Sequence, residues 1–277
     1  LTYAGIIEDN AGSGATGTVA VTLNGTTVLT LTGVNTYSGA TTLGATANTL
    51  ALKDSGSIAN SAKVTVGSTA IFDISQSTTG ASIVSLNSAG TSLSGTGTIT
   101  LNGGTLQLAQ DTAGTYGNAV TVGGSASIVS DRVSNGAGVT HTLGTLSLGA
   151  YTLTIDKGAY VTSGTAGITF SGATSLTGAT AGITTTSAGV LTTLTGSVTS
   201  TVTGNALTVA GSGDTTLSGG LNTSTSATLT KNGSGTLTLG AAGNYTGATT
   251  INAGVIKLGA NNAITNSSAL NIAASSA

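Results

Sequence analysis

The chain of 277 residues has no cysteine, proline, methionine or tryptophan, and only 5% of its residues are charged. Ordinary globular domains are roughly 25% charged. Without cysteine there are no disulfides and no thiolate ligands for a metal, so the fold does not depend on the redox compartment. The six basic and eight acidic residues are scattered and leave a net charge of −2. The sequence therefore has no basic patch for nucleic acid, and we expect no nucleic-acid partner.

Aromatic side chains, at 3% of residues, and long apolar runs are also scarce. No uninterrupted apolar run approaches the ~20 residues that a membrane helix requires, so we expect no membrane-spanning segment. No amphipathic helical stretch of useful length is visible, because glycine, which disfavours helices, recurs throughout. The chain starts at Leu1 without a basic-then-apolar leader, so we expect either maturation after export or a segment of a longer protein.

What the sequence has instead is glycine, 44 residues in all, and short alternations of apolar and hydroxyl residues. Residues 18–23 (TVAVTL), 145–148 (TLSL) and 151–155 (YTLTI) are examples. Each predicts a short strand with one buried and one hydrated face. Clusters of Gly, Asn and Ser between them indicate turns. Low charge with a positive mean hydropathy argues against disorder, so the composition predicts many short strands.

One segment near the start of the chain recurs near its end. Residues 29–43 and 237–251 share eight of fifteen positions without a gap. After a length difference of two residues the match continues, and Asn60-Ser61 corresponds to Asn266-Ser267. Self-similarity over about forty residues indicates a stacked repeat architecture. The repeat-defining positions are Leu29, Leu31, Tyr37, Gly39, Thr41, Thr42, Leu237, Leu239, Tyr245, Gly247, Thr249 and Thr250.

Many short strands fit either an antiparallel sandwich or a parallel solenoid, and the long repeat favours the solenoid. Scarce charge agrees, because equivalent residues of a solenoid stack ~4.8 Å apart, where two like charges repel by about 0.9 kcal/mol even in water. We therefore predict an all-β fold, a single-chain parallel β-helix (β-solenoid) continuous over residues 1–277. Motif copies lie at about 1–69 and 205–277 with degenerate coils between them, and the tract 172–204 is the least specified.

Residues 233–259, GSGTLTLGAAGNYTGATTINAGVIKLG, resemble the autotransporter-associated β-strand repeat. Residues 217–231 and 3–14 are also similar to that family, so the resemblance covers about half the chain, at its two ends. The resemblance implies a right-handed parallel β-helix in the exported passenger region of a large bacterial surface protein. It also implies a secreted, extracellular or cell-surface location and the absence of catalysis.

Candidate chemical sites are few. His141 is the only histidine, and because a metal site needs several ligands, a solvated strand position is favoured. The adjacent pairs Asp131-Arg132 and Asp156-Lys157 lack the clustered carboxylates and aromatic platforms of a polysaccharide-cleaving groove. Surface or turn ion pairs are favoured for them, and Lys53-Asp54 is interpreted in the same way. We predict no catalytic residue, no metal site and no cofactor.

Three other motifs are interpreted as structural. The stretches Gly211-Ser212-Gly213 and Gly233-Ser234-Gly235 are corners, because no helix follows to complete a phosphate-binding loop. Thr-x-Thr pairs such as Thr152/Thr154 and Thr236/Thr238 could bind ice if they aligned on one face, but their unequal intervals argue against alignment. Tyr37 and Tyr245 share one repeat position, where packing over a core corner, with the hydroxyl on a backbone partner, is favoured over an exposed adhesive surface.

The sequence leaves three functions open. The favoured one is a non-catalytic structural protein of the bacterial cell surface or extracellular matrix, assembling head-to-tail into filaments or a coat, because neither end shows an evident cap. The alternatives are an adhesin stalk or passenger fragment and, more remotely, a polysaccharide-active β-helix enzyme. The expected partners are further copies of the chain, as a homo-oligomer, and other surface or matrix components.

Overall fold

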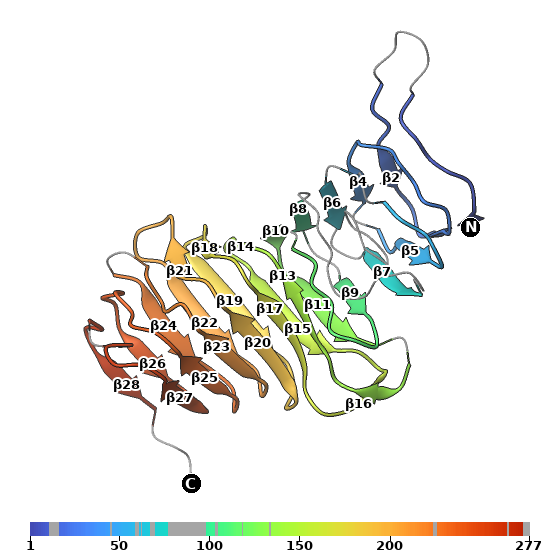
Figure 1. Cartoon of the computed structure of the whole chain (residues 1–277). Coiled ribbons are helices and arrows are strands. Elements are labelled where there is room, and N and C mark those ends of the chain that lie inside the picture. The colour runs from blue at the N-terminus through green and yellow to red at the C-terminus, as the bar shows by residue number, and fades with distance from the viewer. Residues whose placement is uncertain are drawn as a thin grey trace.

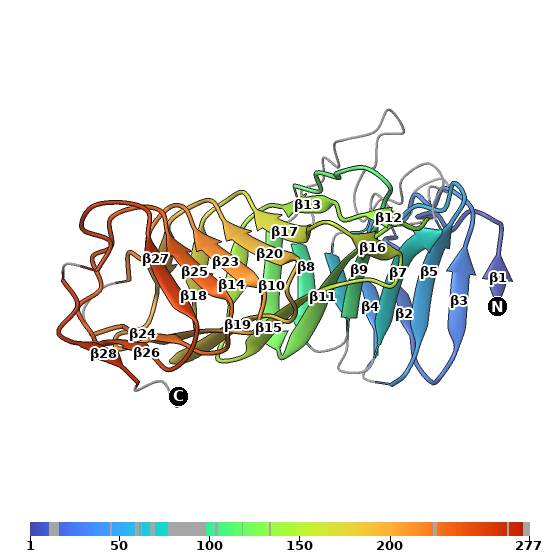
Figure 2. The same ribbon diagram turned by 90° about the horizontal axis from the view of Figure 1, so that it is seen from below.

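The structure, a computed structural model, describes residues 1–10, 17–44, 46–58, 61, 63–66, 70–76, 98–102, 105–117, 119–132, 134–223, 226–264 and 266–273. Within these residues the chain has 28 β-strands and no helix. Its strands pair in parallel, and neighbours in a sheet are never consecutive along the chain. The chain therefore winds as the predicted all-β parallel β-solenoid, seen along its length in Figures 1 and 2.

The long sheet runs from one end of the rod to the other (Figure 2). Its strands are β1 (Thr2–Tyr3), β3 (Val28–Leu31), β5 (Thr49–Lys53), β7 (Ile71–Gln76), β9 (Thr105–Ala109), β11 (Ala126–Asp131), β15 (Thr152–Lys157), β19 (Thr180–Thr185), β22 (Ala206–Ala210), β24 (Thr228–Lys231), β26 (Thr249–Ile251) and β28 (Leu270–Ile272). Coil length varies: Thr230 pairs with Thr250, whereas Phe72 pairs with Leu106. The corners absorb these differences, because the ladder holds the strands in register.

Three further sheets complete the fold. An eight-stranded sheet contains β2 (Val21–Leu23), β4 (Thr41–Leu43), β6 (Lys63–Val66), β8 (Thr98–Asn102), β10 (Ala119–Gly124), β14 (Leu146–Leu148), β18 (Thr174–Leu176) and β21 (Val198–Ser200). A six-stranded sheet contains β13 (Thr140–Leu143), β17 (Ala166–Phe170), β20 (Val190–Leu194), β23 (Asp214–Leu217), β25 (Thr236–Leu239) and β27 (Val255–Leu258). β12 (Gly136–Ala137) and β16 (Val161–Ser163) pair separately. Coils from β13 to β22 therefore have three main sheets, and the described coils on either side have two.

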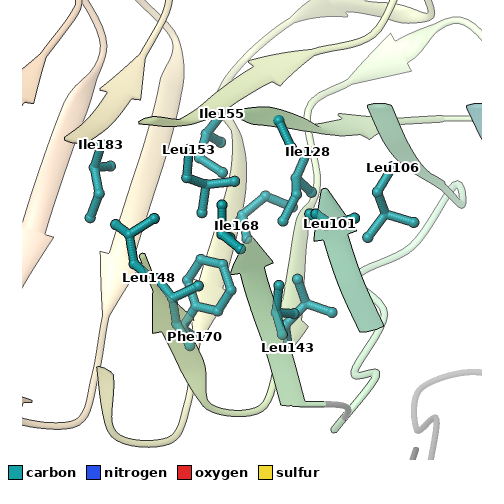
Figure 3. Close-up of a cluster of buried hydrophobic side chains, with 14 of the residues drawn as sticks. Leu101, Leu106, Ile128, Leu143, Leu148, Leu153, Ile155, Ile168, Phe170 and Ile183 are labelled. Carbon is teal, nitrogen blue, oxygen red and sulfur yellow. The ribbon is translucent and has the colours of Figure 1, made fainter. Parts of the chain in front are cut away.

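The core lies between the sheets and is apolar. Inward and outward residues alternate along the strands, as in β20 and β22. Figure 3 shows Leu143, Phe170 and Leu148, from the six- and eight-stranded sheets, facing Leu153 and Ile155 of the long sheet. All five are fully buried or nearly so. Each such side chain stabilises the fold by about 1.5–3 kcal/mol relative to exposure, and this term adds up coil after coil.

The two motif copies lie in different sheets. The LTL segment of the first copy (29–31) belongs to β3 of the long sheet, whereas that of the second copy (237–239) belongs to β25 of the six-stranded sheet. Likewise β4 lies in the eight-stranded sheet and its counterpart β26 in the long sheet. Local pairing is the same, since β3 pairs with β5 as β25 pairs with β27. The repeat therefore specifies a corner and its flanking strands, not one face of the rod.

The tract 172–204, expected to be the least specified, is regular and contains β18 to β21. Thr185 and Thr192 of this tract are buried, and so is Thr215 of β23 (Asp214–Leu217) on the next coil. Thr185 Oγ1 is 2.8 Å from Thr192 Oγ1 and 2.9 Å from Thr215 Oγ1. Threonine therefore serves inside this core as well as outside it: these three hydroxyls bond one another, whereas the Oγ1 of Thr174, which is also buried, has no hydrogen-bond partner among the residues that the structure describes.

Candidate functional site

A buried polar corner closes the bend between β3 and β4 in the first motif copy. Tyr37 is fully buried, and its hydroxyl oxygen lies 2.6 Å from Thr41 Oγ1. Thr41 Oγ1 in turn lies 2.8 Å from Ser61 Oγ, which donates to the Gly39 carbonyl at 3.0 Å. These four residues, Tyr37, Gly39, Thr41 and Ser61, are called the polar corner below. Its hydroxyls find their partners inside the solenoid.

The second copy repeats the polar corner contact for contact. The Tyr245 hydroxyl lies 2.6 Å from Thr249 Oγ1, which lies 2.9 Å from Ser267 Oγ. Ser267 Oγ donates to the Gly247 carbonyl at 2.8 Å. The tyrosines are buried as expected, but their hydroxyls meet threonine hydroxyls, not the backbone partner that was expected. The serine was matched between the copies in the sequence, but nothing in the sequence showed that it closes this network.

The glycine of each polar corner lies against another backbone. A Cβ added to Gly39 would lie 2.3 Å from the Val19 carbonyl oxygen, and one on Gly247 would lie 2.2 Å from that of Ala227. The glycine N–H donates to the same carbonyl oxygen in each case, at 3.0 Å and 2.9 Å. A side chain would break this contact, so the close approach of two coils requires glycine here.

The other repeat-defining residues pack or form ladders. Leu31, Leu237 and Leu239 are buried in the core, and Leu29 packs against it partly buried. Thr42 and Thr250 are half-buried on the outer face, where Thr42 pairs with Thr22 and Thr250 with Thr230.

Burial keeps the corner tyrosines neutral. It raises the pKa of Tyr37 to about 12, against the smaller opposing effect of the Thr41 hydrogen bond. The pKa of Tyr245 is raised for the same reason, again with a smaller opposing effect from Thr249. Both phenols therefore stay protonated near neutral pH, and the polar corner acts through hydrogen bonding and packing instead of acid–base chemistry.

His141 is fully buried in β13, so the expectation of a solvated strand residue was wrong. Its Nδ1 accepts from the Gly114 N–H at 3.2 Å, and its Nε2 lies 3.3 Å from the Asp131 carbonyl oxygen. The Tyr116 ring packs edge-on against it, with centroids 5.7 Å apart. Burial lowers the pKa of His141 to about 4, while the Asp131 carbonyl acts weakly the other way. The imidazole is therefore neutral and already bonded on both sides.

Asp131 and Arg132 do not form the expected ion pair with each other. Asp131 is buried, and its carboxylate accepts from Gln107 Nε2 at 2.9 Å and from the backbone N–H groups of Arg132 and Tyr160 at 2.8 and 3.1 Å. Arg132 instead pairs with Asp111 at 3.3 Å. Asp131 ends β11 and Arg132 follows it, and each of the two charged groups finds a partner on another coil.

The remaining charged pairs belong to strand ends. Asp156 Oδ1 accepts from the backbone N–H of Lys157 at 2.8 Å and from Thr186 Oγ1 at 2.5 Å. Lys53 is the exposed last residue of β5, and Asp54 follows in a turn with φ of 55°. The Asp156 contacts hold the end of β15 against the next coil.

The two Gly-Ser-Gly stretches are stacked corners, as predicted. Gly211 and Gly233 have φ of 99° and 73°, a region that suits glycine. The Gly235 N–H donates to the Gly211 carbonyl at 3.1 Å, which joins one turn to the next. Strands β23 and β25 follow the two stretches, so neither opens a helix that could bind a phosphate.

Lys231 is a buried cation that the sequence analysis missed. It is 1% exposed, and its Nζ donates to the carbonyls of Asn232 and Gly233 at 2.7 Å each. Burial lowers the pKa of Lys231, and the charge of Asp214 partly offsets that effect. The sequence did contain a signal for this burial. Lys231 follows the inward Leu229 by two residues, and the alternation of side chains along a strand turns it inward as well.

Threonines stand in register on the outer face of the six-stranded sheet, one in each strand from β13 to β25, and Lys257 takes this position in β27. They are Thr142, Thr169, Thr193, Thr216 and Thr238. The corners therefore absorb some differences in coil length. The Thr-x-Thr pairs themselves do not align on one face, as predicted, because Thr152/Thr154 lie in the long sheet and Thr236/Thr238 in the six-stranded sheet. The neighbouring column is not threonine throughout, because Thr140 is followed by Gly167, Leu191 and Asp214. The flat double array that ice binding needs is thus not formed on this sheet.

The part of the chain that the structure describes contains no group of three or more His, Asp or Glu residues placed to hold a metal ion. Among the same residues there is no helix long and apolar enough to cross a membrane.

Comparison with known proteins bears on the same residues. The profile of the passenger-associated-transport-repeat family matches residues 21–45 and 229–258. No curated protein and no solved structure matches the chain. Each matched segment holds the tyrosine, glycine and threonine of one polar corner, which confirms the resemblance to an autotransporter repeat at those residues.

Proposed function

We propose that this autotransporter passenger-type repeat protein is a non-catalytic structural rod of the bacterial cell surface or extracellular matrix. The observation that carries the proposal is the polar corner, which recurs with the same contacts in a motif copy near each end of the chain. A chain that rebuilds one buried corner extends a ladder in one dimension and does not fold around a cleft.

The composition is compatible with an extracellular location. Passenger repeats suggest a secreted or surface-exposed location. A chain without cysteine is indifferent to an oxidising medium. The absence of catalysis is supported by the repeat family, which is not known to be catalytic, and by His141 and Asp131, whose polar atoms bond backbone and side chains of the rod.

Labelling of intact cells tests the location. An antibody raised against the purified protein should label intact cells of the source bacterium or its culture supernatant, and small-angle scattering of the protein should give the profile of a rod. Labelling that appears only after lysis would contradict the surface location. A compact scattering profile would contradict the rod.

Head-to-tail association of copies is the finer part of the proposal. Inward positions of the outermost described strands are exposed: Leu258 in β27 by 51% and Ile272 in β28 by 68%, and Tyr3 in β1 by 41%. Another coil placed on these edges would cover them and pair the free ladder groups. We propose that a second copy supplies that coil, a heterologous contact that need not close.

Sedimentation velocity over a range of concentrations tests this association. Association should strengthen with concentration and be lost in Ile272→Lys, which places a charge on the inward side of the edge. Val255→Lys is the matched control, because Val255 is 54% exposed on the outer face, beside Thr236. Monomers at every concentration, or equal effects of the two variants, would refute head-to-tail assembly and leave the adhesin stalk as the function that the same repeat supports.

A further inference from the structure

The outer face of the long sheet is hollowed at Gly182, where β15, β19 and β22 lie side by side (Figure 1). Gly182 stands in register between Thr152 and Thr208, so a column of threonines loses one side chain at that point. The groove has a volume of about 300 Å³, at the lower end of the range that small ligands occupy in proteins.

Most residues that line this groove carry a hydroxyl group, and one of them, Tyr151, is aromatic. Thr152, Thr180, Thr184 and Thr208 line it together with Tyr151. The Tyr151 side chain is 42% exposed, in a chain with only 3% aromatic residues. Its ring lies over Gly149 at the corner before β15, where a Cβ on Gly149 would lie 3.0 Å from Tyr151 Cδ2. An exposed ring therefore stands beside a row of groups that both donate and accept hydrogen bonds.

We infer that the groove at Gly182 binds a neutral saccharide unit, with the sugar ring against Tyr151 and its hydroxyls against the threonines. A sugar presents an apolar C–H face and a rim of hydroxyls, and the groove offers a counterpart to each. The inference goes beyond the rod function, since it concerns binding by the folded chain wherever that chain is located.

The absence of charge in the lining favours an uncharged ligand. No charged residue lines the groove, so a phosphate or a uronate would give up its hydration without meeting a cation. A purely apolar ligand would bury the threonine hydroxyls without partners, which is also costly. A neutral polyhydroxyl compound avoids both penalties.

The bound sugar is not cleaved. Glycoside hydrolysis needs two carboxyl groups across the glycosidic bond, and the lining contains none. Asp156, which lies on β15, already accepts from the Lys157 N–H and from Thr186. The groove is therefore a binding site and not an active site.

Calorimetric titration of the folded protein with cellohexaose, maltohexaose and chitohexaose tests the inference. At least one of these neutral oligosaccharides should bind with a Kd in the millimolar range or better, and polygalacturonate should not. Tyr151→Ala removes the stacking surface and should weaken binding by about tenfold or more. Gly182→Thr places a Cβ 2.7 Å from Thr152 Oγ1, so it displaces a lining hydroxyl and fills the groove, and it should weaken binding as well. Tyr151→Phe keeps the ring and should retain most of the affinity.

Tyr160→Ala is the matched control, since Tyr160 is exposed by 45%, as Tyr151 is, but lies outside the groove. It should leave the affinity unchanged. Thermal unfolding of each variant shows whether it is folded, and because Tyr151 lies on the surface, Tyr151→Ala decides the question even where Gly182→Thr does not fold. Binding to none of the three oligosaccharides would overturn the inference, as would equal affinities of wild type, Tyr151→Ala and Tyr160→Ala.

Discussion

At the scale of single residues, glycine has two separate roles in this chain. Gly247 is required because another backbone touches it, with the Ala227 carbonyl oxygen 2.2 Å from where a Cβ would lie. Gly204 is required only by its φ of 70°, and no atom lies within 4 Å of its Cβ position. The two positions therefore separate the cost of a steric clash from the cost of an unfavourable backbone conformation.

We expect Gly247→Ala to lower the free energy of unfolding by about 2–3 kcal/mol, as overpacking does, and Gly204→Ala to lower it by about 1 kcal/mol. Gly39→Ala should resemble Gly247→Ala, because its Cβ would lie 2.3 Å from the Val19 carbonyl oxygen. Urea unfolding followed by circular dichroism measures all three. A Gly204→Ala variant at least as destabilised as Gly247→Ala would show that the coils do not approach this closely.

Burial of His141 makes stability depend on pH. The pKa of His141 falls from 6.5 to about 4 on folding, so the unfolded chain binds the proton more readily. Above pH 6.5 the imidazole is neutral in the folded and the unfolded chain alike, and the full free energy of unfolding is present. As the pH falls toward 4, protonation of the unfolded chain lowers that free energy. With 1.36 kcal/mol per pKa unit, the loss amounts to about 3 kcal/mol. Urea unfolding at pH 7 and at pH 4 should show it.

His141→Gln is the control for this prediction, because glutamine is neutral throughout. The variant should lose the decrease between pH 6.5 and pH 4 even if it is less stable at pH 7. Asp9, whose pKa is lowered by hydrogen bonds from Ser38 and Val19, acts only below the ordinary carboxyl pKa and so in a more acidic range. An unchanged decrease in His141→Gln would assign the pH dependence to other groups.

At the scale of the strand, the sequence predicts well which face of a strand each residue occupies, but it predicts poorly which sheet the strand joins. Alternation places Leu237 and Leu239 inward, and the same rule places His141 and Lys231 inward, against their polarity. Sheet membership could not be predicted, because it depends on how many strands each coil has. The six-stranded sheet begins at β13 and the eight-stranded sheet ends at β21, so the LTL segments of the two copies lie in different sheets although their neighbours correspond.

The polar corner shows a similar limit. Tyr37 and Thr41 are four residues apart, and their proximity could be predicted from the bend between two strands. Ser61 joins them from the next coil, and its position depends on the length of the corner before it. A single sequence without structure contains the serine but does not show which coil it serves.

Insertions test whether the strands fix the register while the corners accommodate differences in coil length. One alanine inserted between Thr192 and Thr193 in β20 should unfold the solenoid or a large part of it, because a shift of one residue turns every later side chain of the strand to the other face. Two alanines inserted after Gly204 should be tolerated, since coil lengths already vary and that corner has free space. Thermal unfolding followed by circular dichroism compares the two, and similar losses would contradict the view that corners absorb length.

At the scale of the whole molecule, we expect the ladder to protect the chain from trypsin. Its six cleavage sites are Lys53 in β5, Lys63 in β6, Arg132 after β11, Lys157 in β15, Lys231 in β24 and Lys257 in β27. A protease needs a segment released from its neighbours, so cleavage follows local opening of the ladder. Lys257 lies in the outermost described strand of the six-stranded sheet and pairs only with β25, whereas Lys157 lies in β15, between β11 and β19.

We therefore expect the folded protein to be cut first at Lys257 and at Lys157 only after global unfolding. Trypsin digestion at 37 °C, with the products identified by mass spectrometry, measures the order of cleavage, and a sample denatured in urea is the control in which all six sites are open. The free energy of local opening differs between the two sites. Opening the coil of Lys257 breaks strand pairing on one side only and exposes residues that are already half-exposed. Opening a middle coil breaks strand pairing on both sides and exposes the core on both sides. Early cleavage at Lys157 would mean that the coils between β13 and β22 open independently and that the long sheet does not stabilise the rod as a continuous ladder.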